Sequence, residues 1–234
     1  MKVLIATPAI NGMICGEYVG SLLHTLQYCA AERIYVEWKY VRGVSEISRG
    51  RDGLASYALR EGFDKLFFID ADQAWTAEDF ARIIKSDKSI IGGTYCKKEL
   101  PLNLNFGILP QHNESFPEKL KTPELFRAWA EKYANEAGEV EIAFLPTGFM
   151  CIDTSVLRKM TEFAPKYRTK DSAQTDEIEV YEFFPIGVFH GYKDTEDFSF
   201  CRFARACDFK IYLNTKVLVD HMGTYNYRVP AEYR

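Results

Sequence analysis

Hydrophobic positions in the first part of the chain follow two alternating periods. Residues 2–7 form an unbroken apolar run that ends at Pro8, which is typical of a buried strand followed by a loop. Residues 15–31 then carry apolar side chains at helical spacing. Residues 33–41 are rich in β-branched and aromatic side chains, so they favour a second strand. The chain is therefore expected to begin with strand, helix and strand.

The same rhythm continues to about residue 95. Helices are predicted over residues 48–61 and 76–85, and strands over residues 65–69 and 89–92. Thr76 reads as an N-cap because Asp79 follows three residues later. Strands and helices that alternate in this way predict an α/β fold: a Rossmann-like three-layer sandwich with a mainly parallel central sheet.

The second half of the chain is less regular. Strands are predicted over residues 102–108, 140–144, 148–152, 180–184, 210–213 and 216–219, and helices over residues 123–135, 153–160 and 195–207. The polar and charged segment PKYRTKDSAQTDEIE, residues 164–178, predicts a mobile loop. Neither a repeat nor a linker divides the sequence, so we expect a single domain over residues 1–234.

Composition narrows the class of protein. With 234 residues, 47% of them hydrophobic, the chain is able to bury a substantial core, which excludes global disorder. The net charge of −4 argues against general nucleic-acid binding through a basic surface. The six cysteines form no CxxC pair and are expected to be reduced core thiols. Apolar runs are too short for a signal peptide or a membrane span, so we expect a soluble, cytoplasmic protein.

Two aspartates follow the predicted strand 65–69 in the segment KLFFIDADQAW. Side chains two residues apart on a strand face the same way, so Asp70 and Asp72 are expected to converge at the strand's carboxyl end. That edge is where open α/β sheets bind ligands. Two carboxylates there suit a hard divalent cation, Mn²⁺ or Mg²⁺. The alternative is a solvated turn, or Asp72 serving a nearby helix N-terminus.

Six segments together resemble the GT-A nucleotide-sugar glycosyltransferases, of the small family-2-like kind of bacteria and phages. FFIDADQAW is preceded by SEISRGRDGLASYAL and followed by SIIGGTYCKKE. FLPTGFMCID, residues 144–153, is similar to the glycine-bearing loop that faces the donor sugar. DTEDFSFCRFAR, residues 194–205, resembles the acidic segment that opens the helix of the catalytic base. VDHMG, residues 219–223, resembles the site of a late histidine ligand.

The resemblance implies a metal-dependent glycosyltransferase whose donor is a nucleotide-sugar, with a UDP-sugar favoured by the fold's members. In that reading Asp70 contacts the donor ribose or the metal, and Asp72 ligates the ion that bridges the diphosphate. His221 would supply a further metal ligand, with Asp220 as its hydrogen-bonding partner. The alternative for His221 is a structural hydrogen-bonding role.

The resemblance also assigns the acids at residues 196 and 197. Asp197 would take the proton of the acceptor hydroxyl as that hydroxyl attacks, and Glu196 would orient the acceptor. The alternative is that both acids complement the dipole of the helix they open, with Asp194 or Thr195 as its N-cap. A base on the face opposite the leaving group implies inversion, and retention stays open.

Further residues are placed at the donor by the same resemblance: Thr7, Pro8, Arg49, Arg51, Asp52 and Gly148. Relatives often carry Asn where this chain has Asp52, and the alternative for both arginines is a solvated helix face. Gly148 lacks a side chain, which permits close backbone approach to a sugar. Lys97 and Lys98 meet phosphates or an anionic acceptor, or form a solvated pair. His190 is a candidate for lining the pocket.

The resemblance divides the domain into a nucleotide-binding half, residues 1–95, and an acceptor-binding half, residues 96–234. The acceptor stays open between a glycan, a protein and a modified DNA base, and the last of these in a duplex must be flipped out or exposed in a groove. A phage-encoded enzyme of this kind would act in the host cytoplasm.

Two competing functions are considered. A non-catalytic nucleotide-sugar-binding module on the same fold would need no acid near residue 197. A haloacid-dehalogenase-type phosphatase also places hydrophobic residues before an Asp-x-Asp motif. That family, however, has Thr or Val two residues beyond the second aspartate, where this chain has Ala74.

Overall fold

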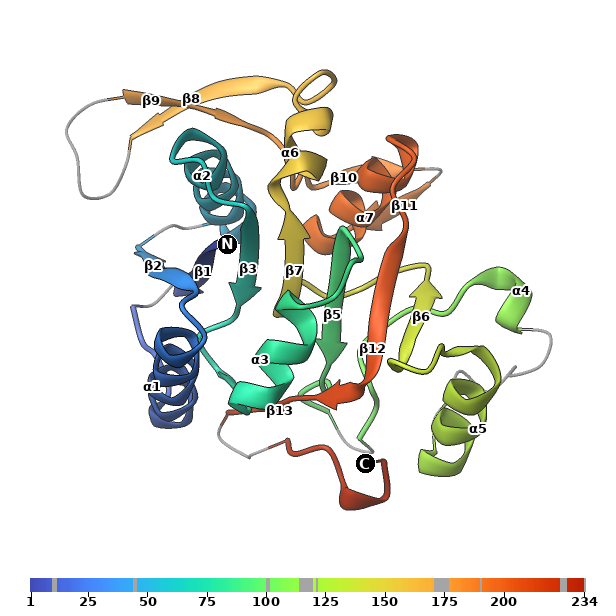
Figure 1. Ribbon diagram of the computed structural model, residues 1–234. Helices are drawn as coiled ribbons and strands as arrows, with labels where there is room; N and C mark the ends of the chain where they lie inside the picture. Colours follow the sequence, from blue (N-terminus) through green and yellow to red (C-terminus); the bar gives the residue numbers. More distant parts are fainter. Residues whose placement is uncertain are drawn as a thin grey trace.

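The protein, seen here as a computed structural model, is described over residues 1–9, 12–43, 46–99, 102–113, 120, 122–170, 177–189, 191–223 and 227–233. Figure 1 shows its elements. The helices are α1 (Gly16–Ala31), α2 (Ile47–Arg60), α3 (Ala77–Ile84), α4 (Pro110–Asn113), α5 (Pro123–Tyr133), α6 (Thr154–Met160), α7 (Glu196–Ala206) and the 3₁₀ turn η1 (Ala231–Tyr233). The strands are β1 (Lys2–Ala9), β2 (Tyr35–Arg42), β3 (Lys65–Ile69), β4 (Gln73–Ala74), β5 (Ile90–Thr94), β6 (Glu139–Ile142), β7 (Phe149–Asp153), β8 (Lys166–Lys170), β9 (Glu177–Tyr181), β10 (Gly187–Phe189), β11 (Tyr192–Asp194), β12 (Ile211–Leu218) and β13 (Asp220–His221).

Seven strands form one sheet in the order β2-β1-β3-β7-β5-β12-β6. Three neighbouring pairs are parallel, namely β1 with β2, β1 with β3 and β5 with β12, and the other three are antiparallel. The α/β class is confirmed, but the prediction of a mainly parallel sheet needs correction, because the sheet is mixed. Since only β7 and β6 are reversed, the carboxyl ends of β2, β1, β3, β5 and β12 still share one edge.

Helices cover both faces of this sheet, as Figure 1 shows. On one face, Leu4 and Phe68 pack in a core with residues of α2, α6 and α7. On the other face, Ile5 and Phe67 pack in a second core with residues of α1 and α3. Successive strand residues enter opposite cores because side chains alternate across a strand. The continuous apolar runs of the sequence therefore reflect strands buried on both faces.

The elements predicted in the first half of the chain are confirmed, with boundaries shifted by at most two residues. The capping box is present, since the Thr76 hydroxyl accepts from Asp79 N and the Asp79 carboxylate accepts from Thr76 N. Glycines at positions 92 and 93 let β5 lie deep in the sheet. A Cβ at Gly92 would stand 2.1 Å from the carbonyl oxygen of Phe149, so only a glycine fits this position.

Predictions for the second half need four corrections. The segment 102–108 forms isolated bridges at Leu104 and Gly107 instead of a strand. Residues 166–170, predicted as loop, are strand β8, which pairs with β9; residues 171–176 of that prediction lie outside the described part of the chain. The strand expected at 180–184 ends at Tyr181. The two short strands expected near the end are one strand, β12, with an irregular register.

Candidate functional site

A cleft of about 800 Å³ opens at the shared carboxyl edge of the sheet. It is lined by Pro8 at the end of β1, by Asp70 and Asp72 after β3, and by Lys98 beyond β5. The segment after β12 contributes Met222. Clefts of this size hold small organic ligands, and this edge of an α/β sheet is where such ligands bind. The cleft is therefore the candidate site.

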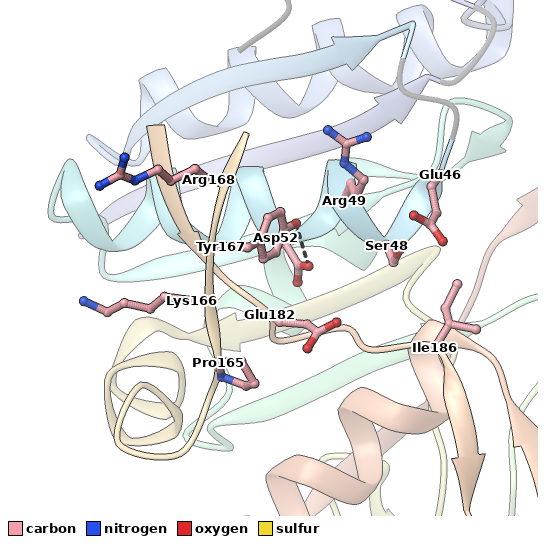
Figure 2. Close-up of a pocket in the computed structure, with 10 residues that line it drawn as sticks. All are labelled: Glu46, Ser48, Arg49, Asp52, Pro165, Lys166, Tyr167, Arg168, Glu182 and Ile186. Atoms are coloured by element: carbon pink, nitrogen blue, oxygen red, sulfur yellow. Dashed lines mark hydrogen bonds between the residues drawn. The ribbon is translucent and has the colours of Figure 1, made fainter. Parts of the chain in front are cut away.

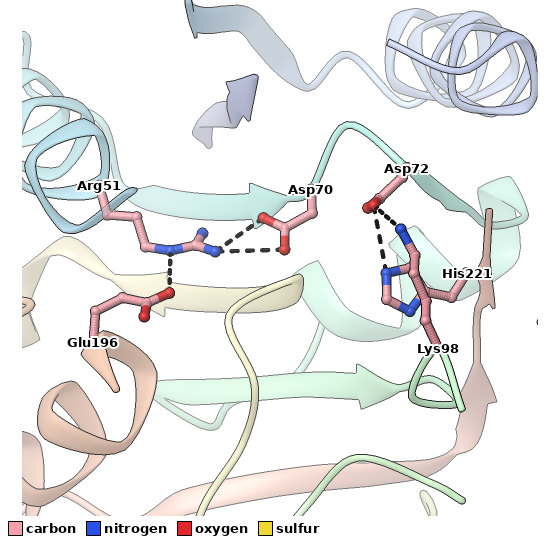
Figure 3. Close-up of polar contacts among 6 residues, drawn as sticks. All are labelled: Arg51, Asp70, Asp72, Lys98, Glu196 and His221. Carbon is pink, nitrogen blue, oxygen red and sulfur yellow. Dashed lines mark hydrogen bonds and ion pairs between the residues drawn. The ribbon is translucent and has the colours of Figure 1, made fainter. Parts of the chain in front are cut away.

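Asp70 is held by a buried arginine that also reaches the first turn of α7. Figure 3 shows Arg51 of α2 between two carboxylates. Its Nη2 lies 3.0 Å from Asp70 Oδ1, and its Nε lies 3.4 Å from Glu196 Oε1. Only 2% of the Arg51 side chain is exposed. The guanidinium thus links the acid at the end of β3 to the acid segment of α7, which are distant in sequence.

The charges of this group stabilise one another. Burial alone would lower the pKa of Arg51, but the carboxylates of Asp70 and Glu196 raise it, so the guanidinium stays charged. Burial raises the pKa of Asp70 and that of Glu196, and Arg51 opposes both shifts. Nη1 of Arg51 is buried and has no hydrogen-bond partner among the described residues. Buried donors are normally satisfied, so this nitrogen is an exception within the group.

Asp72 has its own nitrogen partners, separate from Arg51 (Figure 3). Its Oδ2 lies 2.5 Å from Lys98 Nζ and 3.5 Å from His221 Nε2. Burial would raise the pKa of Asp72, but hydrogen bonds and charges from His221 and Lys98 outweigh it and lower the pKa to about 2. Asp72 is therefore a carboxylate throughout the physiological pH range.

The two aspartates do not converge as the strand argument predicted. Strand β3 ends at Ile69, and a turn follows in which Gln73 N donates to Asp70 O at 3.0 Å. In a turn the side chains no longer alternate as on a strand, so Asp70 points to Arg51 and Asp72 to Lys98 and His221. The turn is fixed from outside, since Asp70 N donates to Gly148 O and Met222 N donates to Asp72 O.

The fit of a divalent ion was tested on this arrangement. No group of three potential ligands occurs among the described residues. Asp72 and His221 do form a pair, and the Nδ1 of His221 lies 3.0 Å from Cys96 O. A carbonyl oxygen only accepts, so Nδ1 carries a proton and Nε2 is the ring nitrogen that faces Asp72. Two protein ligands of these types fit an ion that takes its other ligands from phosphate oxygens and water.

Glu196 and Asp197 lie in the first turn of α7, as the sequence predicts. The N-cap position is held by Thr195, but its hydroxyl donates to Asp197 Oδ1 instead of accepting a backbone N–H of the helix. Asp194 is paired with Arg202. Neither Thr195 nor Asp194 therefore caps α7 with its side chain, which is the role that the alternative to catalysis gave them. Glu196 faces Arg51, and Asp197 is half-buried beside it.

Tyr95 is a site residue that the sequence reasoning missed. It follows β5 directly and is 6% exposed, and its ring lies edge-on to that of His221 with centroids 4.9 Å apart. Burial raises its pKa well above the usual range, and the charges of Asp70, Arg51 and Asp197 also act on its hydroxyl. A Cβ at Gly148 would lie 2.4 Å from that hydroxyl. The position of Tyr95 at a strand's carboxyl end was the signal available in the sequence.

Of the two residues predicted at the end of β1, only Pro8 lines the cleft. Thr7 is fully buried, and its hydroxyl contacts the Tyr18 hydroxyl and accepts from Trp38 Nε1 at 3.0 Å. Its side chain is thus engaged in the interior. Lys97 is exposed, and His190 lies outside the described residues.

Arg49 and Asp52 line a different pocket, of about 360 Å³, between α2 and the β8–β9 hairpin (Figure 2). Arg49 Nη2 donates to Thr169 Oγ1 at 2.8 Å. Asp52 is 2% exposed and accepts from the Tyr167 hydroxyl at 3.0 Å. It also accepts from the backbone N–H groups of Phe183 and Phe184. Both side chains thus hold the hairpin and the segment after it against α2.

The fold and its edge cleft define an α/β protein with a seven-stranded mixed sheet. Comparison with protein-family models and with curated proteins finds no match for this chain. Within the described ranges, every helix is too short or too polar to cross a membrane.

Proposed function

We propose that the protein is a glycosyltransferase that moves a sugar from a nucleotide-sugar, a UDP-sugar by the resemblance noted in the sequence, to an acceptor hydroxyl. One observation carries the proposal: the buried Arg51 joins Asp70, which lines the cleft, to Glu196 in the first turn of α7, where Asp197 follows. A donor site needs groups for a diphosphate, and a transfer site needs a carboxylate close by. The cleft supports the first, and the acid pair that Arg51 links to it supports the second.

At the donor end, Asp72 and His221 would hold Mn²⁺ or Mg²⁺. The ion, when bound, neutralises the leaving nucleoside diphosphate as a Lewis acid. Lys98 lies on the same carboxylate oxygen, so its ammonium would turn from Asp72 toward phosphate oxygens. Arg51 holds Asp70 in place and opposes the rise that burial causes in the pKa of this carboxyl. Pro8 forms part of the wall for the nucleotide.

At the acceptor end, Asp197 takes the proton of the attacking hydroxyl. Its carboxylate is oriented by the Thr195 hydroxyl and by Phe198 N, which donates at 2.9 Å. Glu196 is fixed by Arg51 and orients the acceptor. The acceptor, whether a glycan, a protein or a modified DNA base, is open.

Calorimetric titration of UDP with and without Mn²⁺ tests the donor site. Binding that depends on Mn²⁺ and disappears in Asp72→Ala is the expected result. Asp87→Ala is the matched control. Asp87 is an exposed aspartate that pairs with Lys88 and lies before β5, at the amino end of that strand and away from the cleft at the carboxyl ends. Equal UDP binding by the wild type and Asp72→Ala would remove the proposed diphosphate site.

Catalysis is tested without knowing the acceptor, because water is itself a hydroxyl acceptor. Slow release of UDP from UDP-glucose, UDP-galactose or UDP-N-acetylglucosamine is expected, and Asp197→Asn should lower the rate while UDP binding is kept. A non-catalytic nucleotide-sugar-binding module would instead bind UDP and release none from any donor, with the same result for Asp197→Asn.

A further inference from the structure

Strand β2 leaves one long edge of the sheet without a neighbour. It is the outermost strand of the sheet order and pairs only with β1 (Figure 1). None of its eight residues is buried, and Tyr35 and Tyr40 are 57% and 43% exposed. Apart from the ladder with β1 and the bond from Tyr35 N to Met1 O, no backbone hydrogen bond joins β2 to the described residues. Such an edge is a template for another strand.

The opposite edge of the sheet is protected. Strand β6 has four residues, and the backbone N–H of Asn135 donates to Glu139 O at 3.0 Å. The Arg205 guanidinium donates to the carbonyl oxygens of Ile142 and Ala143. Side chains and loop backbone thus occupy carbonyl groups that a further strand would need. β2 has no equivalent protection among the described residues.

The sequence of β2 is complementary to itself when two copies run antiparallel. With Trp38 on the two-fold axis, Glu37 of each copy stands opposite Lys39 of the other, and Val36 stands opposite Tyr40. Opposite charges and apolar–aromatic pairs at directly facing positions stabilise antiparallel strands. Moving the axis to residue 37 places two glutamates opposite each other, and moving it to residue 39 does the same with two lysines. The charges therefore favour the axis at Trp38 over the position on either side of it.

Glu37 and Lys39 are already held on one face of the strand by Tyr57 of α2. The Tyr57 hydroxyl donates to Glu37 Oε1 at 2.6 Å, and Lys39 Nζ lies 4.3 Å from the centroid of the Tyr57 ring. Both side chains are thus turned toward α2 and away from the backbone groups at the free edge. A partner strand can therefore pair with the backbone of β2 without moving the side chain of Glu37 or Lys39.

We propose that β2 is a self-association surface through which two copies of this chain pair antiparallel about Trp38 and form one continuous sheet. The interface is isologous, as in most homodimers. Because the paired strands run in opposite directions, the two carboxyl-edge clefts open on opposite sides, and both stay accessible. This inference does not depend on the proposed glycosyl transfer.

Sedimentation equilibrium over a range of protein concentrations tests the pairing. The wild type is expected to dimerise. Glu37→Lys and Lys39→Glu each place like charges opposite each other at two positions. The dimer of each variant should therefore have a dissociation constant about tenfold higher than that of the wild type. The double substitution restores opposite charges and should restore the dimer.

Mixing the two single variants gives the sharpest result. A chain with Glu37→Lys and one with Lys39→Glu are complementary, so the mixture should form heterodimers although neither variant self-associates well. A loss of structure in either variant cannot produce that rescue. Reversal of the exposed ion pair Lys166–Glu179 on the β8–β9 hairpin is the control and should leave association unchanged. A wild type that is monomeric at every concentration, or a dimer insensitive to both single substitutions, overturns the proposal.

Discussion

Replacing Asp52 with asparagine should change how the stability of the protein depends on pH. The Asp52 carboxylate is buried beneath the β8–β9 hairpin. Its Oδ1 accepts from Phe183 N at 2.8 Å and Phe184 N at 3.0 Å, and its Oδ2 accepts from the Tyr167 hydroxyl. Asparagine has the same shape, and its oxygen can accept both backbone bonds while its amide donates to the tyrosine oxygen. The substitution thus removes a titrating group and keeps the packing.

The expected size follows from the pKa. Burial raises the pKa of Asp52 from 3.8 to about 7, against the hydrogen bonds that favour its charged form. Because the pKa of Asp52 is higher in the folded than in the unfolded state, its contribution to the unfolding free energy is fully present below about pH 4. That contribution is lost as pH rises through 7. Three pKa units at about 1.4 kcal/mol each give a loss of about 4 kcal/mol above neutrality. Asp52→Asn lacks this loss, so its stability relative to the wild type should rise with pH.

Urea denaturation at a series of pH values measures this difference directly. The unfolding free energy of Asp52→Asn minus that of the wild type should increase between about pH 4 and pH 8 by up to about 4 kcal/mol. Asp87→Asn, at an exposed aspartate, is the control for a carboxyl that is not buried. If the difference in unfolding free energy stayed constant between about pH 4 and pH 8, the conclusion that burial raises the pKa of Asp52 would be refuted.

Two further substitutions test the candidate site. Arg51→Met leaves Asp70 and Glu196 without their cation, so we expect the unfolding free energy at pH 7 to fall by about 3–5 kcal/mol. Adding Glu196→Gln should recover part of this loss. A loss below about 1 kcal/mol, the scale of exposed ion pairs, would contradict a buried ion-pair link. Gly148→Ala brings a Cβ to 2.4 Å from the Tyr95 hydroxyl, so we expect a loss of about 1–3 kcal/mol in thermal or urea unfolding. Tyr95→Phe in the same chain should relieve only the contact with the hydroxyl, because Cζ of the ring would still lie 2.8 Å from that Cβ. A Gly148→Ala variant as stable as the wild type would show that Tyr95 does not hold this contact.

Local pattern was sufficient for the helices up to β5 and for the strands β1, β2, β3 and β5 of the main sheet. Their apolar spacing reflects burial of each segment, which does not depend on which strand lies beside it. The segment 148–152 was predicted as a strand, but nothing in its residues says that it enters between β3 and β5 in reverse. That position makes two of the three antiparallel contacts of the sheet. Long-range placement, which local periodicity does not encode, is therefore the source of the main error.

Charge misled the prediction for residues 164–178. Lys166 and Arg168 made the segment look like a loop, yet Tyr167 and Thr169 alternate with them as on a strand with one face on the protein. At the site, Asp70 and Asp72 were found because two acids follow an apolar run. Arg51 and His221 were also named as site residues, but their pairing with Asp70 and Asp72 respectively was not predicted, because they come from segments far away in the sequence.

The late insertion of β7 also has a consequence for synthesis on the ribosome. Until residue 153 has emerged, β3 and β5 of a nascent chain lack the strand that lies between them, and two central edges are left open to wrong partners. Arrival of β7 closes that gap and, in the same event, brings Gly148 O to the backbone N–H of Asp70. A growing chain thus closes the centre of its sheet with β7, and it completes the sheet and the lining of the cleft only when β12 and Met222 have followed.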